Sequence, residues 1–381
     1  MRKTVLFLGG VVVSAWIFLG NAKNPVPYST MADEGIVQEK ICANVTKDNK
    51  CYGYNQLNET EKNLYTDLLT GLANFSEQIE IQTLEPDVLE KVFNCVMADH
   101  PEIFYVSGYH YTGYADGEKI SKMTVRGEYT YTKPEVDALQ KKIDVSTTRI
   151  LSEIDPDATE YEKVKFVYES IINRTEYDLE APDSQNICSV FLNKKSVCLG
   201  YAKATQYLLQ KLGIDTFLVT GSVKNGESHA WNLVKVDGDW YYLDSTWGDA
   251  YYRMEDVTTQ DVQKNAVNYD YFCVTTNQLK RTHTIKSFVN LPVCTATKAN
   301  YYVAENAFFT EYDEERIEQL FTEAKAEGKE CLRLKCATDN VYDTMHRELI
   351  ENRHIFRFLD QKQGKVSYTN NAELRSVSFW L

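Results

Sequence analysis

The sequence predicts a multidomain α+β protein, in which helices pack on antiparallel sheets. Two capping-box patterns, Asn58-x-x-Glu61 and Thr159-x-x-Glu162, each precede apolar residues at helical spacing. Between Thr216 and Thr246 the pattern changes to strand-like runs, two of which flank an Asp-Gly pair, a strong hairpin signal. The chain has 381 residues, a length that suggests two or three domains.

Composition excludes several classes of protein. Apolar residues make up 43% and charged residues 25% of the chain, which is typical of globular domains rather than of disordered or fibrous chains. The net charge of −14, without any basic stripe, argues against nucleic-acid binding, because phosphate neutralisation needs clustered Lys and Arg. We therefore expect no nucleic-acid partner.

The first 22 residues have the pattern of a signal peptide. Arg2 and Lys3 precede an apolar run from Val5 to Leu19, and Gly20-Asn21-Ala22 is similar to a small-x-small cleavage site. An uncleaved membrane anchor is the alternative, although the run is shorter than the ~20 residues that a span needs. In both cases we expect a secreted or cell-surface protein that meets a membrane only through this segment, if it stays uncleaved.

Helix and strand signals divide the rest of the chain into three regions. We expect an N-terminal α+β domain over 23–133, with helices after Asn58 and from Pro86 to Ala98 and strands near 103–114 and 123–132. A core over 134–255 begins with a long helix from Pro134 to about Glu153. A C-terminal α+β region over 256–381 has a helix near 313–327 and strands near 330–337 and 374–380.

Nine cysteines are present, an odd number, so at least one thiol remains unpaired if the others form disulfides. Close pairs such as Cys42/Cys51, Cys273/Cys294 and Cys331/Cys336 are plausible bridges, although sequence cannot fix the connectivity. A metal site is a further candidate, formed by Cys331, Cys336, His346 and His354. The spacing of the two histidines is, however, too wide for the usual zinc-binding pattern. We expect neither a metal nor a cofactor.

Cys198 lies at the predicted start of a helix. With Ser196 as N-cap, this helix runs from Val197 to Leu212, and Gly213 occupies the position where a C′ glycine belongs. The unpaired N–H groups and the partial positive charge of a helix N-terminus favour the nucleophilic thiolate. Gly200 has no side chain, so a substrate or a strand could approach the first turn of this helix closely.

A general base for this thiol is expected at His229. A two-residue turn at Asp237-Gly238 pairs Val236 with Asp239, which places Asp244 diagonally across from His229 on the same face of the hairpin. Asp244 can then orient the imidazole and stabilise its cationic form. A three-residue turn without a bulge would move Asp244 to the opposite face.

The predicted catalytic set is therefore Cys198 as nucleophile, His229 as proton carrier and Asp244 as the group that holds the ring. Asn232 and Asp249 are less favoured third members. Gln185 is a candidate oxyanion donor beside the backbone N–H of Cys198. Trp247 and Tyr201 are equally good candidates for the walls of the site or for ordinary core packing.

Three segments carry a family resemblance. They are Lys194-Lys-Ser-Val-Cys198-Leu-Gly-Tyr, Leu212-Gly-Ile, and His229-Ala-Trp-Asn through Asp244-Ser-Thr-Trp247. Together they resemble the core of the transglutaminase-like superfamily, over roughly 135–250. The resemblance implies a papain-like fold, with the family's Cys, His and Asp positions at Cys198, His229 and Asp244. The flanking regions more weakly resemble those of exported Gram-positive members, and the acidic calcium-site arrangement of large animal transglutaminases is not seen.

The sequence thus predicts an exported thiol enzyme that transfers or hydrolyses acyl groups at peptide or glutamine amides through a thioester. Its partner would be a protein or peptide substrate, with a cell-wall peptide as one candidate. Hydrolysis is preferred, since water is the default acceptor unless a site excludes it. The alternative is a catalytically silent surface module that keeps the fold for protein or cell-wall binding, which the long flanking regions motivate.

Overall fold

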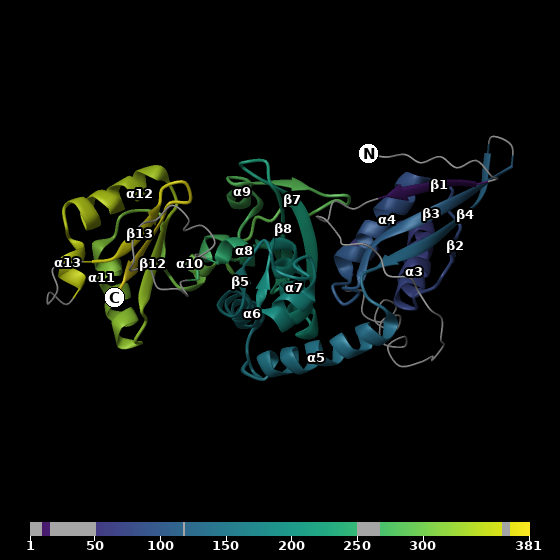
Figure 1. The fold of residues 1–381 in the computed structure, drawn as a ribbon. Helices are drawn as coiled ribbons and strands as arrows, with labels where there is room; N and C mark the ends of the chain where they lie inside the picture. Colours follow the sequence, from purple (N-terminus) through teal and green to yellow (C-terminus); the bar gives the residue numbers. More distant parts are fainter. Residues whose placement is uncertain (1–9, 16–50, 117–118, 250–266, 360–365) are drawn as a thin grey trace.

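The computed structural model describes residues 10–15, 51–116, 119–249, 267–359 and 366–381. Three units, each with its own four-stranded sheet and helices, lie side by side in chain order (Figure 1). The predicted α+β class is confirmed. In the described parts of the chain, none of the helices combines the length and the apolar character that crossing a bilayer requires.

The N-terminal unit is a sheet of strand order β1-β3-β4-β2 that carries two packed helices. The predicted capping box at Asn58 and Glu61 is present, and Pro86 begins the second long helix as expected. The elements are β1 (Gly10–Ala15), α2 (Tyr52–Asn55), α3 (Glu59–Ala73), β2 (Ile79–Ile81), α4 (Pro86–Asp99), β3 (Val106–Asp116) and β4 (Lys119–Tyr129).

Part of the segment with the signal-peptide pattern forms strand β1 of the N-terminal sheet. Gly10–Ala15 pairs antiparallel with β3, from Gly10 opposite Tyr114 to Ala15 opposite Tyr109. This segment contains three consecutive valines, whose branched side chains favour the extended conformation. The rest of the proposed leader lies outside the described residues, and its cleavage stays a prediction.

The middle unit packs helices against a sheet of strand order β10-β7-β8-β9. The capping box of Thr159 and Glu162 is present, and the irregular segment before α7 holds only short elements. The elements are α5 (Lys133–Leu151), α6 (Glu160–Arg174), β5 (Glu176–Tyr177), the π-helix Ser189–Asn193, β6 (Lys195–Ser196), α7 (Cys198–Lys211), β7 (Thr216–Val223), β8 (Ser228–Val236), β9 (Asp239–Leu243), α8 (Ser245–Gly248), the 3-10 turn Tyr269–Tyr271, α9 (Thr276–Leu279) and β10 (His283–Lys286).

The core sheet continues beyond residue 255, where the sequence analysis placed the end of the core. Strand β10 pairs antiparallel with β7, with His283 opposite Val223 and Lys286 opposite Thr220. An isolated bridge between Tyr242 and Val274 adds a further contact of the later chain with β9. A strand that arrives about 40 residues after the hairpin completes this sheet, so the structural core includes part of the region assigned to the C-terminal domain.

The C-terminal unit has a sheet of strand order β11-β12-β14-β13, in which β11 and β12 are parallel and the other pairs antiparallel. The predicted helix near 313–327 and the predicted strands near 330–337 and 374–380 are present. The elements are α10 (Tyr301–Ala304), β11 (Phe308–Phe309), α11 (Glu314–Ala326), β12 (Cys331–Cys336), α12 (Asp339–His346), the π-helix Arg347–Glu351, α13 (Ile355–Phe358), β13 (Tyr368–Asn371) and β14 (Ser376–Trp380).

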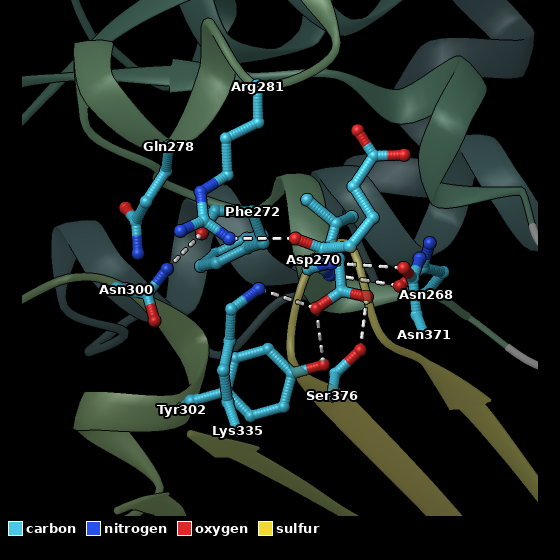
Figure 2. A network of polar contacts seen from close by, with 12 residues as sticks. Asn268, Asp270, Phe272, Gln278, Arg281, Asn300, Tyr302, Lys335, Asn371 and Ser376 are labelled. Atoms are coloured by element: carbon cyan, nitrogen blue, oxygen red, sulfur yellow. Dashed lines mark hydrogen bonds and ion pairs between the residues drawn. The ribbon is translucent and has the colours of Figure 1, made fainter. Parts of the chain in front are cut away.

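A buried charge cluster joins the middle and C-terminal units (Figure 2). The Asp270 carboxylate accepts from Lys335 Nζ at 2.6 Å and from Tyr302 Oη at 3.1 Å through Oδ1, and from Ser376 Oγ at 2.6 Å through Oδ2. Lys335 and Ser376 come from β12 and β14, whereas Asp270 belongs to the 3-10 turn Tyr269–Tyr271 of the middle unit. A buried charge is costly unless it is paired, so this cluster fixes the junction of the two units.

The predicted disulfides do not form. All eight cysteines in the described residues are free thiols, including both members of Cys273/Cys294 and Cys331/Cys336, while Cys42 lies outside those residues. Cys331 and Cys336 begin and end strand β12. Five residues of extended strand span about 16 Å, well beyond the ~7 Å that a disulfide can bridge between Cα atoms.

Candidate active site

Cys198 is the first residue of α7, and Val197 is its N-cap. The predicted N-cap, Ser196, is therefore wrong by one position. The Ser196 hydroxyl instead lies 2.6 Å from Ser189 Oγ and 3.1 Å from the Ser184 carbonyl, so it ties the preceding loop together rather than capping the helix. The Cys198 side chain is partly exposed. Its position still places the sulfur beside the unpaired N–H groups of the first turn.

The other end of α7 agrees with the sequence. Gly213 has a φ of 78°, and the amides of Gly213 and Ile214 donate to the carbonyls of Gln210 and Leu209. This is the Schellman pattern of a C′ glycine, which ends the helix and turns the chain into β7.

Gly200 serves the protein's own packing rather than the approach of a substrate. A Cβ at this position would lie 2.0 Å from Ser196 Oγ and 2.7 Å from the Ser184 carbonyl oxygen. The loop before α7 therefore lies directly against the first turn of the helix. The turn that carries Cys198 is thereby held by that loop, and only glycine permits the contact.

The hairpin register is confirmed. Val236 pairs with Asp239 across Asp237-Gly238, whose φ values of 50° and 90° fit a two-residue turn with two left-handed residues. The ladder continues to Asn232 opposite Leu243, and Asp244 follows directly as the N-cap of α8. His229 Nε2 lies 2.8 Å from Asp244 Oδ2, as the diagonal arrangement predicted.

The His229 ring is paired with the Asp244 carboxylate and lies near the Cys198 thiol. Its side chain is 5% exposed, and with Nε2 engaged by Asp244 the remaining ring nitrogen is available to Cys198. Burial by itself would lower the pKa of His229, but the Asp244 carboxylate and, to a smaller extent, the nearby Cys198 outweigh it and raise the pKa to about 10. At neutral pH the ring is therefore held as an imidazolium.

Asp244 accepts hydrogen bonds at both carboxylate oxygens. Oδ1 accepts the backbone N–H groups of Thr246 at 2.9 Å and Trp247 at 3.1 Å. Oδ2 accepts His229 and also His283 Nε2, which lies 3.0 Å away. Burial would raise the pKa of Asp244, but the two imidazoles outweigh it and hold the pKa well below its ordinary value. The carboxylate therefore stays ionised although it is fully enclosed.

His283 is the part of the site that sequence reasoning missed. It is the first residue of β10, is fully buried, and has its Nδ1 2.8 Å from Thr282 Oγ1. An Nδ1 that accepts the hydroxyl proton leaves Nε2 to donate to Asp244. The sequence contains only a weak signal for His283. This residue is one of six histidines in the chain, and it begins the short alternating segment His-Thr-Ile-Lys.

Indole rings enclose the two imidazoles. The Trp247 ring centroid lies 5.8 Å from that of His229 and 4.5 Å from that of His283, so Trp247 forms a wall of the site. Trp231 lies parallel to His229 and edge-on to His283. Tyr201, the other candidate wall, is fully buried and donates to Asp249 and to a backbone carbonyl, so it belongs to the core.

Two of the remaining candidates bind other groups of the core. Asp249 accepts from Tyr201 at 3.0 Å, and Asn232 donates to the Ala202 carbonyl at 3.0 Å, so each has another partner. Gln185 is half-buried in the loop that packs on the start of α7. Its role as an oxyanion donor stays a prediction.

His229, Asp244 and His283 also form the described group that could hold a metal ion, since their ligand atoms all lie within 4.8 Å of one another. Hydrogen bonding accounts for this grouping without a metal, because the carboxylate already accepts four donors, about as many as it can. In the described chain, Cys331, Cys336, His346 and His354 do not group in this way.

Residues 148–245 match the family described as the Transglutaminase-like superfamily. The middle of this chain is a transglutaminase-like core. The matched segment includes Cys198, His229 and Asp244, whereas His283 lies 38 residues beyond its end. The family resemblance seen in the sequence is thus confirmed for the core.

Two curated relatives share part of this core. Kyphoscoliosis peptidase of Mus musculus is 27% identical over 146 residues, which are 34% of this chain and 22% of the relative. Kyphoscoliosis peptidase of Homo sapiens is 27% identical over 135 residues, 31% of this chain and 20% of the relative. The chain therefore spans about a fifth of the length of these relatives. A solved structure of a TGase is 17% identical with a TM-score of 0.27, over 50% of this chain and 53% of that one.

Proposed function

We propose that this protein is an exported thiol enzyme that cleaves or transfers acyl groups at peptide or glutamine amides. The observation that carries the proposal is the His229 ring, which is paired with a buried carboxylate and lies near Cys198, a partly exposed residue at the start of a helix. Such an order of nucleophile, imidazole and carboxylate is the general requirement for nucleophilic catalysis by a thiol. The transglutaminase-like core supports the same chemistry.

In the first half of the reaction, the Cys198 sulfur attacks the amide carbonyl carbon. The developing oxyanion is met by the backbone N–H of Cys198, with the Gln185 amide as the second candidate donor. His229 then gives its proton to the leaving nitrogen, the C–N bond breaks, and a thioester remains on Cys198. Asp244 keeps the ring oriented throughout and stabilises its positive charge.

In the second half, an acceptor resolves the thioester. Water, deprotonated by His229, gives hydrolysis, whereas a lysine amine gives an isopeptide bond. We favour hydrolysis of a peptide bond, since water is the default acceptor, and the curated relatives are called peptidases. The substrate would be a protein or peptide outside the cell, with a cell-wall peptide as one candidate. Export follows from the proposed leader over 1–22.

A catalytically silent surface module is the second candidate. The flanking units, each built on its own four-stranded sheet, favour it, because they offer large surfaces for binding a protein or the cell wall. Iodoacetamide separates the two candidates. An enzyme should show rapid, selective alkylation of Cys198 near neutral pH, whereas a silent module should leave that thiol unreactive.

The decisive experiment follows products by mass spectrometry. Full-length protein would be incubated with glutamine-containing peptides, with and without an added primary amine, beside Cys198→Ala and the control Cys331→Ala. Cys331 is a free, partly exposed thiol whose pKa is raised by burial. We expect cleaved or deamidated peptide from wild type and from the control, and none from Cys198→Ala. Full activity of the Cys198→Ala protein on these peptides would contradict the proposal.

A further inference from the structure

A second thiol–imidazole–carboxylate series lies in the N-terminal unit. Cys51 Sγ is 4.0 Å from His100 Nε2, and His100 Nδ1 is 2.7 Å from Glu102 Oε1. The three residues come from the N-cap of α2, the C-cap of α4 and the segment after α4. Their order is the same as in the core, but none of them belongs to the core.

The surroundings of His100 favour its charged form. Its side chain is 6% exposed and lies next to the Tyr65 ring, the buried Asp99 carboxylate and Glu102. Burial would lower the pKa of His100, but Glu102 and the contact with Cys51 outweigh it and hold the pKa well above its ordinary value. The ring that faces the Cys51 sulfur therefore carries a positive charge.

The other described cysteines lack this environment, apart from Cys198. Five are buried, and burial raises the pKa of each, as it does for partly exposed Cys331. Cys51 is a free thiol with partial exposure, so a small reagent can reach it. Among the described thiols, Cys51 and Cys198 alone face an imidazole whose other nitrogen binds a carboxylate.

The backbone around Cys51 argues against a second acyl-transfer site. The N–H groups of Gly53 and Tyr54, the second and third residues of α2, each donate to the Asp99 carboxylate at 2.9 Å. A buried carboxylate thus occupies two backbone donors that this turn could otherwise offer to an oxyanion. Thiol–disulfide exchange has no oxyanion and needs only an accessible thiolate.

We propose that Cys51 is a modification site for thiol–disulfide exchange with low-molecular-weight disulfides. The Cys51 sulfur attacks one sulfur of the small disulfide, a new S–S bond forms, and the original S–S bond breaks. The other half leaves as a thiolate and takes a proton from water, so the small disulfide is the oxidant and the thiol of Cys51 is oxidised. His100 stays paired with Glu102 in the mixed disulfide, and an added small thiol reverses the step.

The test uses full-length protein with the Cys198→Ala substitution, so that the core thiol cannot react, and cystamine as the probe. Folded samples would be quenched with acid at timed intervals, and the cysteamine adduct would be located by peptide mass spectrometry. We expect Cys51 to be modified severalfold faster than Cys331 in the same molecule, because Cys51 faces an imidazole whereas burial raises the pKa of the Cys331 thiol. Dithiothreitol should then remove the adduct.

Glu102→Gln supplies the variant test, because Glu102 is partly exposed and its loss leaves the buried His100 in place. We expect slower modification of Cys51, because His100 loses the carboxylate that favours its charged form. The exposed Glu59→Gln should leave the rate unchanged. Equal rates at Cys51 and Cys331, or no effect of Glu102→Gln in a sample with the native thermal midpoint, would overturn the proposal. Because the readout is an adduct at Cys51, failure of the proposed catalytic function would not alter it.

Discussion

His283 Nε2 lies 3.0 Å from Asp244 Oδ2, the same carboxylate oxygen that accepts the hydrogen bond from His229. One buried carboxylate thus orients two imidazoles, one of which faces the thiol. We expect His283→Leu to lower kcat/KM about 10- to 100-fold, because a hydrogen bond to a charged group contributes about 1.5–3 kcal/mol. The acid limb of the pH profile should move to higher pH, since Asp244 loses a donor that lowers its pKa.

The matched variant is His283→Gln, whose side-chain amide can donate from nearly the same position. It should recover most of the activity and the native acid limb. Thermal unfolding would be measured for both variants. If Leu and Gln variants lost activity equally without a change in the pH profile, His283 would have only a packing role.

Asp244→Asn should move the alkaline limb of the pH profile. In the wild type the raised pKa of His229, about 10, keeps the ring charged through neutral pH, and the charge is lost only as the pH rises through that value. Without the carboxylate, the pKa should fall toward the ordinary 6.5 of an imidazole, and the alkaline limb should fall with it. By analogy with other imidazole–carboxylate pairs, kcat should drop about 10⁴-fold. An unmoved alkaline limb would contradict this assignment.

Gly200→Ala should displace the turn that carries Cys198. The new Cβ would meet Ser196 Oγ and the Ser184 carbonyl oxygen well inside contact distance. Overpacking of this kind costs about 1–3 kcal/mol of folding free energy. We expect kcat to fall by more than KM rises, because the nucleophile moves while most of the surface stays intact. Denaturant titration and steady-state kinetics would check the two effects.

The double variant Gly200→Ala with Ser196→Ala separates the two clashes. Removal of the Ser196 hydroxyl relieves the nearer contact, so part of the stability should return. The carbonyl of Ser184 remains 2.7 Å from the added Cβ and prevents full recovery. Wild-type kinetics in the Gly200→Ala single variant would show that the contact with the loop does not position Cys198.

Asp270→Asn should weaken the junction between the middle and C-terminal units. The substitution leaves the buried Lys335 ammonium without its charged partner, and breaking such a pair costs about 3–5 kcal/mol. The exposed pair Glu59–Lys62 is the control, where Glu59→Gln should cost less than about 1 kcal/mol. Adding Lys335→Met to Asp270→Asn should restore part of the free energy of unfolding. Equal losses at the two pairs would contradict the role of the cluster.

Local patterns predicted much of this molecule. The capping boxes, the C′ glycine at Gly213 and the Asp237-Gly238 turn each depend on a few adjacent residues, and each is present. The register of one hairpin was sufficient to bring His229 and Asp244 together. The N-cap of α7 was displaced by one residue, because Ser196 uses its hydroxyl to bind the loop instead.

Long-range features were beyond the sequence. His283 lies 39 residues after Asp244 in the chain, and the pairing of β10 with β7 brings the two side chains together. A strand of only four residues carries little sequence information about which strand it will pair with. The proposed disulfides failed for a related reason, since closeness along the chain does not bring two Cβ atoms together on an extended strand. The Asp270–Lys335 pair joins residues 65 positions apart and has no local pattern.

The position of β10 in the chain also affects when the site can be completed during synthesis of the protein. A ribosome-bound chain that has emerged only through β9 already holds Cys198, His229 and Asp244, but Asp244 still lacks its second imidazole donor and the sheet still lacks its outer strand. The finished arrangement becomes available only after the segment ending at Lys286 has emerged and paired with β7. The thiol centre therefore depends on a strand that is synthesised well after its three principal residues.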